Sequence, residues 1–184
     1  MALLSLLAPD RMVQRIWELD PEGLVRSGIR GLVLDVDNTL TEWNRPQLVA
    51  GVEEWLAAAR RAGLALCIAS NASGEGRVAA LAEQIGAGYV VRAGKPRRRA
   101  YLRAAERMGT TPETTAVIGD QIFTDTLGGN RAGMTTVLVR PFNRRDFPAT
   151  KVMRLAEWVV LRLLARGGRG AGRDVSAKNG RPGG

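Results

Sequence analysis

Two aspartates and a threonine follow a short apolar run in the first quarter of the chain. Leu32-Val33-Leu34 leads into Asp35, Asp37 and Thr39. Side chains two positions apart on a strand point to the same side, so both carboxylates are expected to leave the end of a buried strand together. Such acids repel each other unless a cation lies between them or one of them carries a proton. Both arrangements suit phosphoryl transfer, in which one carboxylate attacks, a magnesium ion neutralises charge and the other carboxylate handles a proton. The alternative is a strand that runs into an ordinary acidic turn.

A second apolar run, residues 64–69, ends at Ser70 and Asn71. It is typical of a buried parallel strand, which would expose the hydroxyl group of Ser70 at the strand end. A hydroxyl group in that place can donate a hydrogen bond to a phosphoryl oxygen. Ser70 could instead cap a helix, and the two roles are compatible because a helix N-terminus also binds anions.

A lysine follows a third apolar run, Tyr89-Val90-Val91, at position 95. An ammonium group beside a carboxylate nucleophile would hold that carboxylate ionised and neutralise charge on the transferring phosphoryl group. The alternative for Lys95 is a solvated surface lysine.

A fourth apolar run, residues 116–119, ends at Asp120, and Asp125 lies about one helical turn further on. Magnesium prefers hard oxygen ligands, usually a few carboxylates together with water. Asp120 therefore fits as a metal ligand alongside Asp35. Asp125 fits either as a ligand or as the group that orients Lys95 or a bound water. It could also be an ordinary acid in the first turn of a helix, where the helix dipole favours it.

The four segments, in this order, resemble the four motifs of the haloacid dehalogenase (HAD) phosphohydrolase superfamily. The resemblance implies that Asp35 is the nucleophile that forms an aspartyl phosphate. It implies that Asp37 is the general acid/base, with its backbone carbonyl on the metal ion.

The resemblance also assigns the other positions. Ser70 would bind the phosphoryl group, Lys95 would stabilise charge, and Asp120 would ligate Mg²⁺. The expected site residues are catalytic Asp35, Asp37 and Lys95; substrate-binding Thr39, Ser70 and Asn71; and metal-binding Asp35, Asp37, Asp120 and Asp125.

Apolar runs alternate with segments of helical spacing at 48–62, 75–86, 97–108 and 124–132, and residues 135–139 predict a fifth strand. This alternation predicts an α/β fold, a doubly wound parallel sheet of the Rossmann-like, HAD-like type, with right-handed crossovers. The segments between Thr39 and Ser70 and between Ser70 and Lys95 have room for only one helix and one strand each. We therefore expect no cap domain and an open site, which favours a large or surface-bound substrate.

The chain has 184 residues, enough for one domain with a sizeable core. It contains no histidine, which excludes catalysis and metal ligation by imidazole. A single cysteine, Cys67, excludes an internal disulfide and favours a reducing compartment. No run is long enough to cross a bilayer, and the apolar residues 1–8 are a poor signal peptide because no basic region precedes them. We therefore expect a cytoplasmic protein.

Two amphipathic segments flank the expected catalytic domain of residues 29–149. Residues 1–28 form the first, and residues 150–166 predict a basic helix. Basic amphipathic segments with tryptophan lie on anionic membranes, but such helices also pack on protein cores, and the sequence leaves both alternatives open. The net charge of +9 attracts anions such as nucleic acid, anionic lipid or polyphosphate. Residues 167–184 form a Gly/Arg-rich tail that we expect to be disordered.

The resemblance narrows to the YqeG-type branch of HAD subclass IIIA. The residues that carry it are 7–10, 28–40, Trp43, Asn71, Lys95, Pro96, 119–121, Thr150, Lys151, Arg154 and Glu157. This branch is related to the phosphatidylglycerophosphate phosphatases of mitochondria and plastids, which implies dephosphorylation of phosphatidylglycerophosphate to phosphatidylglycerol. The implied partner is an anionic phospholipid, and the implied location is the cytoplasm, peripheral on the inner face of the membrane. Mg²⁺ is the expected cofactor, and no tightly bound organic cofactor is expected.

The sequence leaves two other functions open. One is an HAD phosphatase that acts on a phosphoprotein or a nucleic-acid phosphate, which the basic tail would suit. The other is a non-catalytic interaction module, or a membrane-docked one, that keeps the phosphatase fold.

Overall fold

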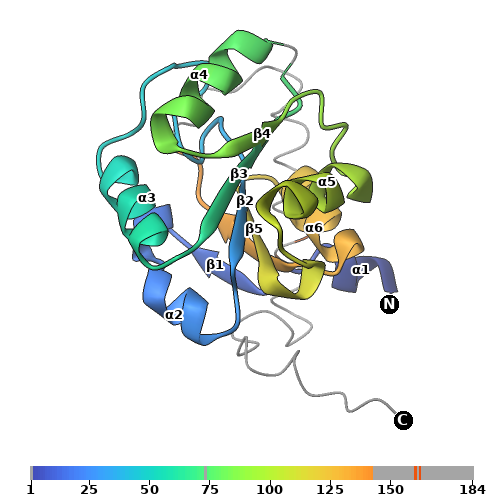
Figure 1. Cartoon of the computed structure of the whole chain (residues 1–184). Coiled ribbons are helices and arrows are strands. Elements are labelled where there is room, and N and C mark those ends of the chain that lie inside the picture. Colours follow the sequence, from blue (N-terminus) through green and yellow to red (C-terminus); the bar gives the residue numbers. More distant parts are fainter. Residues whose placement is uncertain (1, 73, 143–159, 161, 163–184) are drawn as a thin grey trace.

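Six strands form one all-parallel sheet, in the order β1-β6-β5-β2-β3-β4 (Figure 1). The computed structural model describes residues 2–72, 74–142, 160 and 162. The strands are β1 (Arg11–Val13), β2 (Gly31–Leu34), β3 (Ala65–Ala69), β4 (Gly88–Val90), β5 (Thr115–Gly119) and β6 (Thr135–Val139). The helices are α1 (Ala2–Leu6), α2 (Pro21–Arg26), α3 (Val52–Arg61), α4 (Glu75–Ile85), α5 (Arg98–Met108) and α6 (Leu127–Ala132). Short helical turns cover Ile16–Glu18, Pro112–Thr114 and, as a π-helix, Ile122–Thr126.

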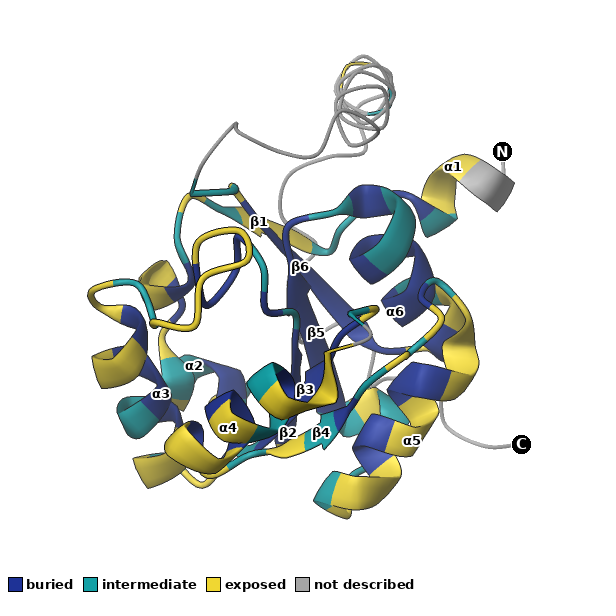
Figure 2. Ribbon diagram, turned by 90° about the horizontal axis from the view of Figure 1, so that it is seen from above, coloured by how far each residue is buried: buried dark blue, intermediate teal, exposed yellow. Residues whose placement is uncertain are grey.

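The helices cover both faces of this sheet, and neighbouring residues of the central strands pack to opposite sides (Figure 2). Leu32 and Leu34 of β2 belong to the core beneath α2, α3 and α4, whereas Val33 belongs to the core beneath α5 and α6. Strands buried on both faces are apolar at successive positions, which explains the uninterrupted apolar runs in the sequence. Cys67 lies in the second of these cores, where burial raises the pKa of its thiol to about 11. The cysteine is therefore a packing residue rather than a nucleophile.

The predicted α/β class, the parallel sheet and the five expected strands are confirmed. The sheet has one further strand, β1, inside the 1–28 segment that was expected to precede the first strand. This three-residue strand pairs with β6, and the Asp10 carboxylate beside it accepts hydrogen bonds from the backbone N–H and hydroxyl of Thr136. The sequence did not predict β1 because Arg11-Met12-Val13 is only three residues long, largely exposed and begins with an arginine, so it gives no apolar run.

No cap domain is present in the described part of the chain, as predicted. Between Thr39 and β3 lie a loop and α3, and between β3 and Lys95 lie α4 and β4. None of the described helices is long and apolar enough to span a membrane.

The N-terminal segment packs on the domain. Leu7, Ile16, Leu19 and Leu24 are buried, and the indole Nε1 of Trp55 donates a hydrogen bond to the Leu19 carbonyl. The expected helix 150–166 and the tail 167–184 lie outside the described residues, apart from positions 160 and 162. Val160 is partly buried and contacts the apolar cluster that contains Leu7.

Candidate active site

The candidate site lies where three neighbouring strands end. Asp35 comes directly after β2, Ser70 directly after β3 and Asp120 directly after β5, and β2 lies between the other two strands. The carboxyl ends of parallel strands share one edge of the sheet, which is where α/β proteins bind their ligands. The topology thus brings together polar residues that are far apart in the sequence.

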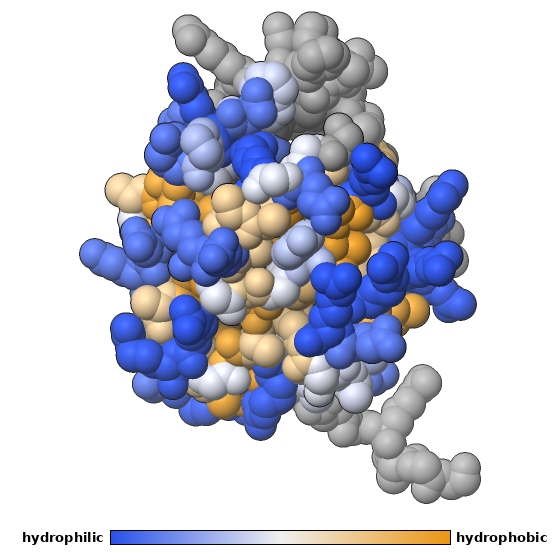
Figure 3. Space-filling model, turned by 45° about the horizontal axis from the view of Figure 1, so that its top comes forward, coloured by the Kyte–Doolittle hydropathy of each residue, from blue (hydrophilic) through white to orange (hydrophobic). Residues whose placement is uncertain are grey.

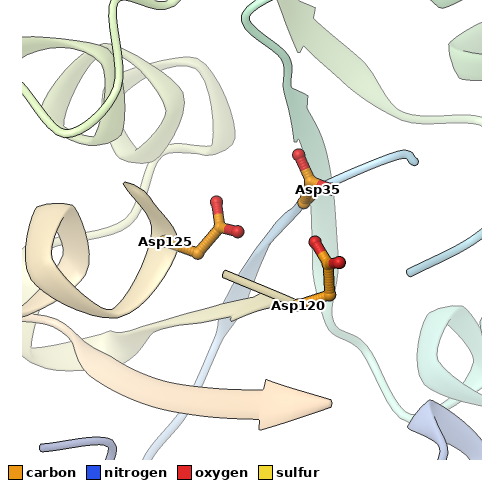
Figure 4. Close-up of side chains that lie close together, drawn as sticks. All are labelled: Asp35, Asp120 and Asp125. Carbon is orange, nitrogen blue, oxygen red and sulfur yellow. The ribbon is translucent and has the colours of Figure 1, made fainter. Parts of the chain in front are cut away.

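Three carboxylates meet at this edge. Figure 4 shows the side chains of Asp35, Asp120 and Asp125 turned toward one another. Each contributes an oxygen, and these oxygens all lie within 4.8 Å of one another. Asp120 and Asp125 are both buried, and the side chain of Asp35 is 13% exposed. The structure therefore joins three of the four predicted metal ligands.

Asp125 is positioned by the π-helical turn Ile122–Thr126, which precedes α6. The backbone N–H of Gln121 donates a hydrogen bond to its Oδ2 atom at 3.3 Å. Gly119 gives the carboxylate its space, because a Cβ atom at that position would overlap the carboxyl group of Asp125. The sequence signal for Asp125 was only its distance from Asp120; the π turn that aims it was not predicted.

Lys95 lies between two of the acids. Its Nζ atom donates to Asp35 Oδ1 at 2.5 Å and to Asp125 Oδ1 at 2.7 Å, and its side chain is 4% exposed. Burial alone would lower the pKa of this lysine, but the charges of Asp125 and Asp35 outweigh burial and raise it. Lys95 is therefore a cation within the site and not a solvated surface lysine.

The site still carries more negative than positive charge. Burial raises the pKa of Asp35 to about 7, although Lys95 acts to lower it, and Asp125 raises it further. Three carboxylates face one ammonium group in a largely buried space, so a second cation would relieve their repulsion. Hard oxygen donors at this spacing suit a divalent ion of the magnesium type.

Asn71 fixes the backbone of Lys95 from both sides. Its Oδ1 atom accepts from the Lys95 N–H at 2.8 Å, and its Nδ2 atom donates to the Lys95 carbonyl at 3.3 Å. The side chain expected to bind substrate is therefore engaged in placing the lysine.

The hydroxyl groups of Ser70 and Thr39 are both buried. Ser70 Oγ accepts a hydrogen bond from the N–H of Ala72 at 3.1 Å, which ties it to the turn that leads to α4. The Oγ1 atom of Thr39 has no hydrogen-bond partner among the described residues. These two hydroxyls remain candidates for contact with a phosphoryl group.

The side chain of Asp37 is not one of the three clustered acids and has hydrogen-bond partners of its own. Its Oδ1 atom accepts from the N–H of Asn44 at 2.7 Å and from Arg77 Nη2 at 2.8 Å, while Oδ2 accepts from Arg77 Nη1 at 3.3 Å. Arg77 was not predicted from the sequence. It is one arginine on an amphipathic helix, and its partner is 40 positions away.

The comparisons with known proteins agree with this geometry. Residues 42–133 match the family model described as haloacid dehalogenase-like hydrolase. The chain is 38% identical over 160 residues to the probable phosphatase YqeG of Bacillus subtilis (strain 168), a match that covers 87% of this chain and 92% of that protein.

A second relative is the phosphatidylglycerophosphate phosphatase 1, chloroplastic/mitochondrial, of Arabidopsis thaliana. Identity is 30% over 174 residues, covering 86% of this chain but only about half (49%) of the plant protein. Among solved structures, the cobalt-bound form of the deoxy-D-mannose-octulosonate 8-phosphate phosphatase YrbI of Haemophilus influenzae aligns with a TM-score of 0.51 at 15% identity, over 80% of this chain and 93% of that chain. This last likeness concerns the fold alone.

Proposed function

The chain belongs to the haloacid dehalogenase-like hydrolases, and from this premise we propose that it is a divalent-metal-dependent phosphomonoesterase. The observation that carries the proposal is the cluster of Asp35, Asp120 and Asp125 around Lys95, at the carboxyl ends of β2 and β5. A carboxylate nucleophile, a fixed ammonium group and a set of hard oxygen ligands are the parts that phosphoryl transfer through a covalent intermediate requires.

In the proposed reaction Asp35 attacks the phosphorus atom and forms an aspartyl phosphate as the bond to the alcohol oxygen breaks. Asp37 donates a proton to that oxygen. Asp37 then accepts a proton from the water that attacks the aspartyl phosphate, which releases inorganic phosphate and regenerates Asp35. Lys95 neutralises charge on the phosphoryl oxygens, and Ser70 and Thr39 are proposed to bind them.

Asp35, Asp120 and Asp125 are the residues that would hold the metal ion, which we propose is Mg²⁺. A bound Mg²⁺ would neutralise phosphoryl charge as a Lewis acid. The backbone carbonyl of Asp37 is proposed as a further ligand.

We propose phosphatidylglycerophosphate as the substrate and phosphatidylglycerol as the product. The Arabidopsis relative, named for this activity, supports the proposal over the aligned segment. The capless site supports it as well, because a phosphomonoester at a membrane surface must be reached without enclosure. The net charge of +9 favours such a surface, where the protein would act as a peripheral protein on the cytoplasmic side.

The first test is Mg²⁺-dependent phosphate release by the purified protein. Phosphatidylglycerophosphate in anionic vesicles is compared with soluble 4-nitrophenyl phosphate, and Asp35→Asn serves as the control. The variant should lose turnover on both compounds while its circular dichroism spectrum stays unchanged, and an active Asp35→Asn protein would refute the mechanism. Turnover of the soluble compound alone would keep the phosphatase chemistry and reject the lipid substrate.

A further inference from the structure

Arg77 of α4 makes a set of contacts that all lie within one short segment of the chain. Besides the two oxygens of Asp37, its Nη2 atom donates to Thr41 Oγ1 at 3.1 Å and to the Arg45 carbonyl at 2.8 Å. Its Nε atom also reaches the Arg45 carbonyl, at 3.2 Å. The guanidinium group thus connects α4 to the loop that leaves the active site after Asp37.

The two halves of this loop differ. The first half is buried, and the backbone N–H groups of Thr39, Leu40 and Thr41 donate to the Val36 carbonyl. Residues 42–47 are exposed, and the loop carries two isolated bridges, from Thr41 to Asp37 and from Thr41 to Leu48. The side chains of Arg77 and Asp37 are more sheltered, at 22% and 27% exposed. A planar guanidinium that binds a carboxylate and a carbonyl at once fixes the direction of both, which a single ammonium group does not do.

The consequence for the reaction concerns the place of the Asp37 carboxylate. Asp37 lies two positions beyond the nucleophile, on backbone whose neighbouring residues are buried, but its own side chain is 27% exposed and needs partners to fix its direction. Asn44 N–H and the two guanidinium nitrogens hold it in one of them. General acid catalysis depends on the placement of the proton donor within hydrogen-bond reach of the leaving oxygen.

We propose that Arg77 is a positioning residue, which places Asp37 for proton transfer to the leaving group by holding both its carboxylate and the 37–48 loop. The inference rests on the proposed function, because it concerns the acid/base step of that reaction. Arg77 acts through Asp37 and does not itself exchange protons with the substrate.

The test compares two substrates that differ in how much they need an acid. The alkoxide of glycerol 3-phosphate is a poor leaving group that needs a proton. The 4-nitrophenolate of 4-nitrophenyl phosphate, by contrast, leaves with little help from a proton donor. Arg77→Ala should lower kcat/KM for glycerol 3-phosphate by about tenfold or more, which is part of the roughly 10²–10⁴-fold that general acid catalysis contributes. The loss for 4-nitrophenyl phosphate should be much smaller. A purely structural role would lower both values by the same factor, and that result would overturn the proposal.

Arg26→Ala is the matched control, because Arg26 also pairs with an aspartate, Asp20, at 2.7 Å, but on the exposed surface of α2. This variant should leave the ratio of the two kcat/KM values unchanged.

Hydrogen exchange at the Asn44 amide gives a readout that does not need activity. This N–H donates to Asp37, so its exchange should become faster in Arg77→Ala and stay as in the wild type in Arg26→Ala. Unchanged exchange at Asn44 would overturn the proposal. A wild-type protein that hydrolyses neither these two compounds nor phosphatidylglycerophosphate in vesicles refutes the proposed function instead, and the exchange measurement then decides whether Arg77 holds Asp37.

Discussion

At the scale of single residues, the electrostatics of the site depend on Lys95. Its ammonium group pairs with Asp35 and Asp125, and all three side chains are largely buried. A buried ion pair adds little net stability relative to an apolar pair, but the loss of one partner leaves a buried charge without compensation. Here the loss of Lys95 would leave two neighbouring carboxylates.

Lys95→Met should therefore lower the free energy of unfolding by about 3–5 kcal/mol in metal-free buffer. Urea denaturation in the presence of a chelator measures it. Added Mg²⁺ should recover part of the loss, because the ion supplies positive charge to the same carboxylates.

The matched control for this loss is Arg26→Met, which breaks the pair with Asp20 in which both side chains are more than half exposed. Exposed pairs contribute no more than about 1 kcal/mol, so this variant should be nearly neutral. Equal losses in the two variants would show that Lys95 has no special electrostatic role.

At the scale of elements, the short helix α6 must lie close to α5 for the π turn to aim Asp125 at the site. Two glycines of α6 allow this approach. A Cβ atom at Gly128 would overlap the ring of Tyr101, and one at Gly129 would approach the side chain of Thr136 within 2.6 Å. The Tyr101 side chain cannot move aside, because it is fully buried. Its hydroxyl also donates to the carbonyl of Thr124, in the π-helical turn, at 2.9 Å.

Gly128→Ala should destabilise the protein by about 1–3 kcal/mol, the usual cost of an overpacked core. The substitution should also weaken Mg²⁺ binding. A larger side chain at position 128 would displace α6, and the π-helical turn that holds Asp125 would move with it. Gly76→Ala is the matched control: Gly76 lies in α4 with open space where its Cβ would be, so alanine should be neutral or stabilise by up to about 1 kcal/mol. Denaturation and isothermal titration with Mg²⁺ measure both effects, and a Gly128→Ala protein as stable as Gly76→Ala would contradict this account of the packing.

The elements that the sequence predicted are those whose signal is local. The runs at β2, β3, β5 and β6 are apolar because both faces of the sheet are covered, and a polar residue directly after such a run marks the strand end. Asp35, Ser70 and Asp120 were found in this way. The sequence pattern of an apolar run fails for β1, a short strand that pairs with the edge of β6.

The partners of the predicted site residues were harder to foresee. Nothing near Asn71 in the sequence indicates that its amide holds the backbone of Lys95. Likewise, Arg77 is one of 27 basic residues in the chain, and only the fold brings it to Asp37. Long-range side-chain hydrogen bonds of this kind depend on the finished tertiary structure, so a pattern of residue types does not reveal them.

At the scale of the whole molecule, a site without a cap domain in the described part of the chain is combined with a net charge of +9. Figure 3 shows strongly hydrophilic side chains around the whole edge of this face, among them a group on the right-hand side, the side on which α5 lies in Figure 1. Helix α5 contributes several exposed arginines, among them Arg98, Arg99 and Arg103. It begins three residues after Lys95, so its first turn is near the site in the chain. A substrate in an anionic surface would meet these arginines while its phosphate group enters the site.

This arrangement predicts binding to anionic vesicles that depends on one face of the protein. The protein should sediment with phosphatidylglycerol vesicles in low salt and not with neutral phosphatidylcholine vesicles. Binding should fall steeply toward 0.5 M salt, since the screening length drops from about 10 Å at 0.1 M to about 3 Å at 1 M. A triple change of Arg98, Arg99 and Arg103 to glutamine should weaken binding strongly, because each basic residue near an anionic membrane contributes about 1 kcal/mol.

The matched triple change removes three exposed arginines on the other side of the sheet, at positions 26, 60 and 61 of α2 and α3. Both variants lower the net charge by the same amount, so a difference between them reports the face and not the total charge. If the two triples lose binding equally, the attraction belongs to the molecule as a whole, and the open site has no preferred orientation on the bilayer. If only the α5 triple loses binding, the arginines beside Lys95 hold the site against the surface that contains its proposed substrate.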